Sequence, residues 1–301
     1  MASMAMQMTK KRMKEQYALQ GTNRPDGSFD PMRMREASDA SMLMLPPEPG
    51  VTFEPVQLGI MPGEKCVPAQ NSDEAVIFYI HGGGLVAGNA QTSRFYASVL
   101  ANATGYTVYT ASYRLAPENR CPAMQSDCIS AYEALLALYP DTPIALVGES
   151  GGAYLSVTTA LLAKERGLRL PAAVVAYSVL IDLSGELKFT KNVESDVSLS
   201  PHALAVLADT CCPDTKMRRD WLISPVYADY TGFPPLLLAW DASEILAVHS
   251  EKLADLAEAA GVEVQVKGYE DAFHAFPTLG HMIPESEEVL QNTIAFIHAH
   301  I

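Results

Sequence analysis

The chain has 301 residues, of which 49% are hydrophobic and 19% are charged. This length and balance fit a large globular α/β domain with a sizeable core, and they argue against overall disorder. The formal net charge is −14, which argues against nucleic acid as a partner, because phosphate binding needs a concentrated basic surface.

The chain carries no signal for a membrane, a disulfide framework or a metal site. No apolar stretch reaches the length of a membrane span, and the N-terminus lacks the apolar core and cleavage site of a secretory signal. The five cysteines are an odd number with no Cys-X-X-Cys spacing, which speaks against disulfides and zinc. We therefore expect a cytoplasmic protein without a metal or other cofactor.

Residues 1–50 are rich in methionine and polar groups and are interrupted by turn signals at 24–27 and 46–50. They predict one or two helices that lie outside the main sheet. Because methionine is flexible, such helices can line a pocket for apolar groups, although they can equally pack a small satellite core.

From Val51 onward the pattern changes to strands that alternate with helices. An antiparallel pair is expected over 53–60 and 66–69, with its turn at 61–63. Short apolar strands separated by helices indicate a mostly parallel sheet with helices on both faces. The later strands are expected at 75–80, 106–111, 143–147, 172–178, 236–240 and 262–269, and the helices at 94–103, 124–139, 150–166, 249–260 and 286–300.

The alternation is broken at about 183–220, a polar segment interrupted by prolines. An insertion at this place in a doubly wound sheet lies over the carboxyl ends of the strands, where ligands bind. We therefore predict a helical cap formed by residues 1–50 and the insertion at about 183–220. The main α/β domain is expected to span residues 51–301.

The most informative motif is Gly148-Glu149-Ser150-Gly151-Gly152, which directly follows the apolar strand at 143–147. A strand that enters a Gly-X-Ser-X-Gly turn and then a helix is a nucleophile elbow. The turn holds the serine in a strained conformation with its hydroxyl exposed. Ser150 is therefore the predicted nucleophile.

A serine hydroxyl is a poor nucleophile, so it needs a base within hydrogen-bond reach and a third group that orients the base. In this architecture the chain order is serine, carboxylate, histidine, which eliminates His81. His274 lies in the loop after the strand at 262–269, where the base has to emerge, and it is the predicted base. His281 is the second candidate.

The residues alone leave two candidates for the carboxylate. Asp241 and Glu244 both follow the strand at 236–240, and either could face the histidine loop. Residue type favours Asp241, because aspartate is the commoner acid in such triads. Aspartate is also frequent in turns and caps, which is the alternative role for Asp241.

A second glycine-rich element is His81-Gly82-Gly83-Gly84. Acyl transfer develops negative charge on a carbonyl oxygen, and backbone N–H groups held around that oxygen stabilise the charge. Gly83, Gly84 and Gly151 are the predicted donors of this oxyanion hole.

From about Ala75 to the C-terminus the chain resembles the hormone-sensitive-lipase-like, or GDXG, branch of bacterial esterases, which have the α/β-hydrolase fold. Glu149 stands where this family has aspartate, and Gly151 where it has alanine. The matching segments are 81–84 (HGGG), 113–118 (YRLAPE) followed by Pro122, Ala123 and Asp127, 148–152 (GDSAGG), Ser224-Pro225 (SP), Pro234-Pro235 (PP) and 274–276 (HGF).

The resemblance has consequences for the acid and for the reaction. It implies that the catalytic acid is Glu244 rather than Asp241, with Leu246 matching the family's leucine. It implies a cofactor-independent serine carboxylesterase that acts on short- to medium-chain acyl esters through an acyl-enzyme. Arg114, Glu118 and Asp127 are implied to hold the loop framework.

Other functions stay open at this stage. A ligand-binding protein on the same fold would lack turnover, and an amide or lactone hydrolase would use the same triad. The expected partner is a small-molecule ester, and a homodimer is left open because no residue decides the oligomeric state.

Overall fold

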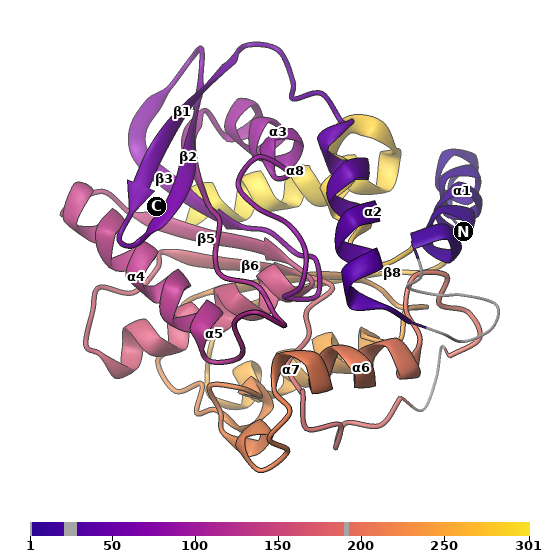
Figure 1. Ribbon diagram of the computed structural model, residues 1–301. Coiled ribbons are helices and arrows are strands. Elements are labelled where there is room, and N and C mark those ends of the chain that lie inside the picture. Colours follow the sequence, from indigo (N-terminus) through magenta and orange to yellow (C-terminus); the bar gives the residue numbers. More distant parts are fainter. Residues whose placement is uncertain (1, 21–28, 190–192) are drawn as a thin grey trace.

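The computed structural model describes residues 2–20, 29–189 and 193–301. Its centre is an eight-stranded sheet with the order β1-β2-β4-β3-β5-β6-β7-β8 (Figure 1). β1 and β2 are antiparallel to their neighbours, and all pairs from β4 to β8 are parallel. The strands are β1 (Val51–Leu58), β2 (Met61–Pro68), β3 (Ser72–Ile80), β4 (Tyr106–Ala111), β5 (Ile144–Glu149), β6 (Ala173–Tyr177), β7 (Leu236–Asp241) and β8 (Val264–Tyr269).

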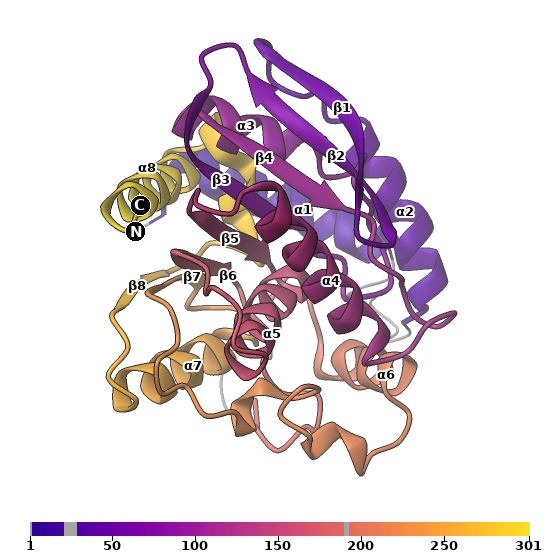
Figure 2. The same ribbon diagram turned by 90° about the vertical axis from the view of Figure 1, so that its left-hand side faces the viewer.

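Helices cover both faces of the sheet (Figure 2). α3 (Arg94–Thr104) and α8 (Pro284–Ala299) pack on one face, and α4 (Ala123–Leu138), α5 (Gly151–Glu165) and α7 (Ala247–Ala259) pack on the other. The predicted α/β class, with a mostly parallel sheet between two helical layers, is confirmed.

The central strands are apolar on both sides, as the sequence pattern requires. Side chains alternate along a strand, so Ile77 and Tyr79 of β3 enter the core under α3 and α8. Phe78 and Ile80 enter the core under α4 and α5. Two buried layers of this kind explain why these strands appear as continuous apolar runs rather than as alternating ones.

The turn predicted at 61–63 is wrong. Leu58 pairs with Met61, so the turn consists of Gly59 and Ile60, and Gly59 has a φ of 61°, which glycine adopts without strain. Gly63 lies inside β2, where a Cβ would overlap the Thr110 carbonyl oxygen of β4. That glycine therefore permits a close approach of two strands rather than a turn.

Every predicted strand and helix of the main domain is present. Their ends differ from the prediction by no more than three residues, except that β2 begins at Met61, five residues before the predicted start at 66. Short 3₁₀ segments complete the chain: η1 (Met217–Arg219), η2 (Pro225–Tyr227) and η3 (Phe276–Met282).

The two segments predicted as the cap lie together beyond the carboxyl ends of the parallel strands (Figure 1). Residues 1–50 contain α1 (Met4–Gln20) and α2 (Pro31–Leu43), and the insertion contains α6 (Pro201–Cys211). α2 contacts both α1 and α6. The turn predicted at 24–27 lies outside the described residues.

The starts of α2 and α6 follow from local chemistry. The Asp30 side chain accepts the N–H groups of Met32 and Arg33, and Pro31 follows it. The Ser200 hydroxyl accepts the N–H of Ala203, and Pro201 follows it. A side-chain acceptor at the cap and a proline in the first turn both favour a helix start.

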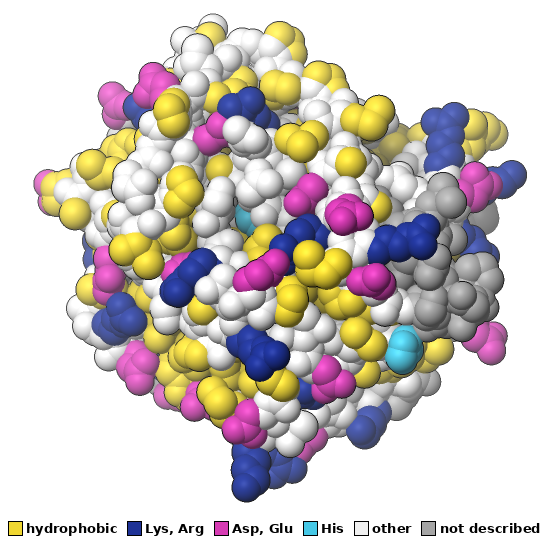
Figure 3. All heavy atoms as spheres, viewed as in Figure 1, with side chains coloured by type: hydrophobic (Ala, Val, Ile, Leu, Met, Phe, Trp, Pro, Cys, Tyr) yellow, Lys and Arg dark blue, Asp and Glu magenta, His cyan; other side chains and the backbone are white. Residues whose placement is uncertain are grey.

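On the face shown in Figure 3, the described residues form no large basic patch, as the acidic composition leads one to expect. Lys and Arg side chains are interspersed there with Asp and Glu. Within the described ranges, none of the helices combines the length and the apolar character that a membrane span needs.

Candidate active site

Ser150 lies at the sharp turn between β5 and α5, with φ 54° and ψ −120°. These angles are strained for a residue with a side chain. The flanking glycines make the turn possible, because a Cβ at Gly148 would overlap the Gly152 carbonyl oxygen, and one at Gly152 would overlap that of Ile80. The turn thus presents the Ser150 hydroxyl at the end of the central strand β5.

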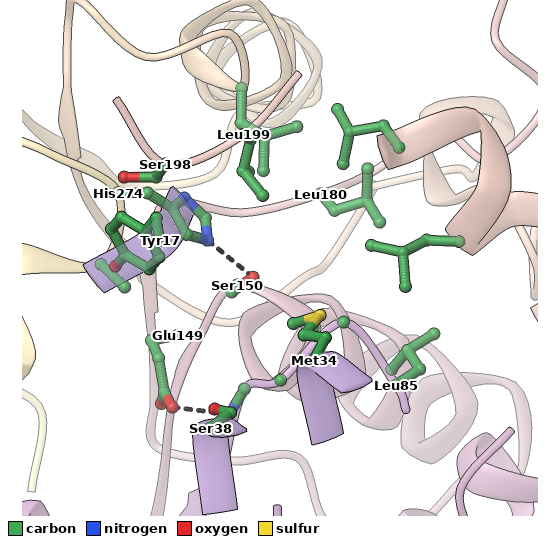
Figure 4. A pocket seen from close by; sticks show the side chains of 18 of the residues that line it. Tyr17, Met34, Ser38, Leu85, Glu149, Ser150, Leu180, Ser198, Leu199 and His274 are labelled. Atoms are coloured by element: carbon green, nitrogen blue, oxygen red, sulfur yellow. Dashed lines mark hydrogen bonds between the residues drawn. The ribbon is translucent and has the colours of Figure 1, made fainter. Parts of the chain in front are cut away.

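His274 and Glu244 come to Ser150 from two other loops. The Ser150 Oγ lies 2.8 Å from Nε2 of His274, a contact that is drawn in Figure 4. Nδ1 of His274 lies 2.7 Å from Oε2 of Glu244. A carboxylate accepts a hydrogen bond from an Nδ1–H, which leaves Nε2 free to accept the serine proton. The three residues predicted from the sequence are thus in one hydrogen-bonded chain.

The two alternative residues lie elsewhere. The Asp241 carboxylate accepts the N–H of Ser243 at 3.0 Å and the N–H of Ala272 at 3.1 Å, so it organises the loops behind the histidine. His281 is on the surface and pairs with Glu287. Neither residue contacts His274 or Ser150 in any recorded hydrogen bond of the described chain.

Burial controls the electrostatics of the histidine–carboxylate pair. Burial raises the pKa of Glu244, and the neighbouring imidazole only partly offsets this. Burial lowers the pKa of His274, but the nearby carboxylates, Glu244 before all others, together outweigh it, so the pKa of His274 is raised. The pair therefore stabilises the imidazolium that forms when a base accepts a proton.

The predicted oxyanion donors converge next to Ser150. Within the described chain, the N–H groups of Gly83 and Gly84 donate no hydrogen bond, and Gly151 begins α5, where backbone N–H groups lack helical partners. A Cβ at Gly151 would lie 3.4 Å from the Gly84 nitrogen. Unused N–H groups at a helix N-terminus form a site for negative charge.

The residues implied to form the loop framework make their contacts in the loop that follows β4. Asp127 accepts the backbone N–H of Arg114 at 2.8 Å and pairs with its guanidinium at 2.8 Å. Glu118 pairs with Arg35 of α2 at 2.7 Å. Arg35 also donates to the carbonyl oxygens of Ala116, at 2.6 Å, and of Val86.

A cavity of about 670 Å³ lies above Ser150. It is lined by residues of α1, α2, α6 and the loops of the main domain, and most of the lining is apolar. Tyr17 of α1 lies beside His274, together with Ser198 of the insertion, and Met34 of α2 lies near Ser150 (Figure 4).

Four residues around the site, Tyr17, Met34, Arg35 and Leu207, were not predicted from the sequence. Each lies on a helix that reaches the site only through tertiary packing, and Arg35 is 83 positions away from Glu118. The methionine content of residues 1–50 was the one local signal for the pocket lining.

In the described ranges, no group of three or more His, Cys, Asp or Glu side chains is placed to hold a metal ion.

Comparisons with known proteins agree with this geometry. A family model described as the alpha/beta hydrolase fold matches residues 77–278. The chain is 30% identical over 251 residues to an acetyl-hydrolase from Streptomyces hygroscopicus, covering 80% of this chain and 84% of that protein. It is 30% identical over 270 residues to an esterase from Acinetobacter venetianus, covering 88% of each.

Solved structures are also similar. An esterase from the bacterial hormone-sensitive lipase family matches with a TM-score of 0.91 and 30% identity, over 100% of this chain and 99% of that one. A hormone-sensitive lipase from a metagenome library matches with a TM-score of 0.88 and 30% identity, over 97% of this chain and 98% of that one. The chain belongs to the α/β-hydrolase fold family, within its hormone-sensitive-lipase-like esterases, and is a carboxylic ester hydrolase.

Proposed function

We propose that the chain is a serine carboxylesterase that hydrolyses short- to medium-chain acyl esters through an acyl-enzyme. The observation that carries this proposal is the hydrogen-bonded chain from Glu244 through His274 to Ser150, with 2.7 and 2.8 Å contacts. It lies at the floor of an apolar cavity and beside unused N–H groups, which together supply a nucleophile, a base and an oxyanion site.

In the proposed acylation step, Ser150 Oγ attacks the ester carbonyl carbon while Nε2 of His274 takes its proton. Glu244 stabilises the imidazolium. The oxyanion of the tetrahedral intermediate accepts hydrogen bonds from the N–H groups of Gly83, Gly84 and Gly151. His274 then gives its proton to the leaving alkoxide, and the alcohol departs.

Deacylation repeats these steps with water. His274 takes a proton from a water molecule that attacks the acyl carbon, and the same three N–H groups stabilise the second tetrahedral intermediate. Its collapse breaks the bond to Ser150 Oγ, which regains its proton from His274 as the carboxylic acid leaves. The reaction needs no cofactor.

The proton transfer also determines on which side of Ser150 each half of the substrate lies. Because His274 protonates the leaving oxygen, the alcohol lies on the His274 side of Ser150, beside Tyr17 and Ser198 (Figure 4). The acyl group lies on the side away from His274.

Apolar side chains crowd the acyl side. A Cβ at Gly84 would lie 3.1 Å from Leu207 Cδ1 and 3.6 Å from Met34 Cε, and one at Gly151 would lie 3.2 Å from Leu85 Cδ2. Side chains this close to the proposed oxyanion site favour short apolar acyl groups. Relatives named acetyl-hydrolase and ethyl acetate hydrolase, at 30% and 28% identity, support the same range.

The decisive experiment measures p-nitrophenol release from p-nitrophenyl acetate. The wild type is expected to turn over the ester, and Ser150→Ala is expected to lose turnover by several orders of magnitude. Ser126→Ala, which removes an exposed serine of α4, is the control and should match the wild type. Turnover retained by a folded Ser150→Ala protein would contradict the proposed function.

A substrate panel tests the chain length and the alternative reactions. We expect kcat/KM to be highest for acetate to hexanoate esters and low for palmitate, with slower hydrolysis of a matched amide and lactone. A preference for palmitate would overturn the proposed acyl range.

Three further expectations belong to this proposal. Residues 1–50 and about 183–220 form one cap over a catalytic domain of residues 51–301, as their joint lining of the cavity supports. All five cysteines are free thiols, which suits a reducing cytoplasm. A homodimer stays a prediction, which light scattering of the purified protein tests.

A further inference from the structure

Glu149 is a buried carboxylic acid to which the proposed reaction assigns no task. It directly precedes Ser150, is only 8% exposed and lines the same cavity. A carboxyl group is costly to bury unless hydrogen bonds stabilise its charge. The contacts of Glu149 are therefore informative about the site.

The side chain of Glu149 holds the glycine loop at 81–84. Its Oε1 accepts the N–H of Gly82 at 2.6 Å. The packing is tight, because a Cβ at Gly82 would lie 2.8 Å from the Glu149 carbonyl oxygen and 3.0 Å from its Oε1. Gly82 directly precedes Gly83 and Gly84, so a shift of the Gly82 peptide displaces both proposed oxyanion donors.

We propose that Glu149 is a positioning residue for the ester hydrolysis: by holding the N–H of Gly82, its carboxylate aims the N–H groups of Gly83 and Gly84 at the developing oxyanion. This inference rests on the proposed function, since the oxyanion arises only when Ser150 attacks an ester. An ionised acceptor forms a stronger hydrogen bond than a neutral one, and a misplacement of about 1 Å can lower a rate about 100-fold.

The charges around Glu149 are few. The ionisable side chains that face it are Tyr79, Tyr96, Tyr113, Tyr177 and His274. Burial raises the pKa of Tyr177 to about 12, and it raises the pKa values of the other three tyrosines well above their ordinary value. Near neutral pH these tyrosines stay uncharged, so His274, which Glu244 contacts from its other ring nitrogen, is the neighbour whose charge changes.

Glu149 and His274 influence each other's protonation. Burial raises the pKa of Glu149 to about 7, although the Gly82 N–H lowers it. Burial lowers the pKa of His274, whereas the carboxylates of Glu244, then of Asp196 and then of Glu149 raise it. Removing the charge at position 149 therefore lowers the pKa of His274. The neutral imidazole, which is the form that accepts a proton, then persists to lower pH.

The test compares the wild type with Glu149→Gln, which keeps the shape without the charge, and Glu149→Asp, which keeps the charge on a shorter side chain. Glu64→Gln is the matched control, because Glu64 of β2 is also 8% exposed and its carboxylate accepts a hydrogen bond at 2.8 Å, from the Arg94 guanidinium, away from the cavity. We would measure kcat and KM for p-nitrophenyl acetate against pH, and inhibition by an alkyl trifluoromethyl ketone. This ketone forms a tetrahedral adduct with a serine nucleophile.

Glu149→Gln is expected to lower kcat about 10- to 100-fold, with KM changed less than about two-fold. Its affinity for the ketone is expected to fall by a factor similar to that in kcat. The acid limb of its kcat profile is expected to move to lower pH. Glu149→Asp is expected to have a lower affinity for the ketone but to keep the acid limb of the wild-type kcat profile. Glu64→Gln is expected to lower stability while leaving ketone affinity and the acid limb unchanged.

Wild-type kcat and ketone affinity in a folded Glu149→Gln protein would overturn the inference. A lowered kcat with an unmoved acid limb also overturns it, because a purely structural loss leaves the pKa of His274 where it was. If Glu149→Gln does not fold, wild-type ketone affinity in Glu149→Asp has the same meaning. The proposed function itself fails by a different result: an active Ser150→Ala variant, or a wild type that the ketone does not inhibit.

Discussion

The residues at the centre of the site act through burial. Glu244 is 1% exposed and His274 is 8% exposed, so the hydrogen bond between them is shielded from water. Electrostatic interactions are stronger in such surroundings than in water. A buried carboxylate in contact with an imidazole is therefore well suited to hold that ring and to stabilise its charged form.

Substitution of the two carboxylates tests this arrangement. We expect Glu244→Gln to lower kcat by up to about 10⁴-fold, because an amide neither stabilises the imidazolium nor fixes the correct tautomer. Asp241→Asn is the matched comparison. It is expected to keep kcat within about ten-fold and to act on stability through the Ser243 and Ala272 contacts. Steady-state kinetics with p-nitrophenyl acetate and denaturation curves separate the two effects, and the reverse order of kcat losses would refute Glu244 as the acid.

The same two carboxylates show which site residues can be predicted from the local sequence and which cannot. Ser150 could be identified from neighbouring residues alone, because an elbow needs its glycines within two positions of the serine. The choice between Asp241 and Glu244 could not be made that way, since both follow β7 and residue type favoured Asp241. The fold of the loop after β7 decides which carboxylate reaches His274, and only the family resemblance indicated Glu244.

At the scale of elements, α2 links the predicted cap to the main domain. Arg35 bonds two backbone carbonyls and Glu118 of the loop after β4, and the Asp39 side chain accepts the N–H of Gly88 at 2.8 Å. These contacts hold Met34 over the oxyanion loop. No local pattern in residues 1–50 predicted them, because both partners become neighbours only in the folded chain.

Two methionines of α2 test the proposed acyl side. We expect Met34→Ala to raise the ratio of kcat/KM for the octanoate ester to that for the acetate ester by roughly ten-fold, because space opens next to Gly84. Met32→Ala is the control on the same helix, since Met32 is 38% exposed and does not line the cavity. An unchanged ratio in Met34→Ala, measured with p-nitrophenyl esters, would place the acyl chain elsewhere.

At the scale of the whole molecule, the sheet separates two large cores, and the thiols lie within these cores. Cys66 belongs to the core under α3 and α8, and the other four cysteines belong to the core under α4, α5 and α7. Each is buried, and burial raises the pKa of every one of these thiols. Both effects suppress the reactive thiolate.

Thiol labelling therefore reports on global unfolding. We expect the native protein to react with Ellman's reagent only slowly near neutral pH, and the unfolded protein to release five equivalents at once, matching its five cysteines. Labelling should follow the unfolding transition seen by circular dichroism. Rapid reaction in the native state of any thiol other than Cys211, which lines the cavity, would show that one of the two cores is open to solvent.

Whole-molecule features were the easiest to predict from the sequence. The parallel sheet follows from apolar strands spaced by helices, which is a pattern that spans the chain. The one clear error, the turn between β1 and β2, arose because Gly63 was interpreted as a turn residue, whereas it faces Thr110 across the sheet. A glycine required by a distant strand has the same appearance in a sequence as one required by a turn.

The central claim, that His274 activates Ser150, is tested most directly by covalent labelling with a p-nitrophenyl alkylphosphonate followed by mass spectrometry. The account predicts one adduct per chain, on Ser150, formed in step with the loss of esterase activity and slowed by several orders of magnitude in His274→Ala. Labelling at another residue, or labelling of Ser150 at the wild-type rate in His274→Ala, would contradict it.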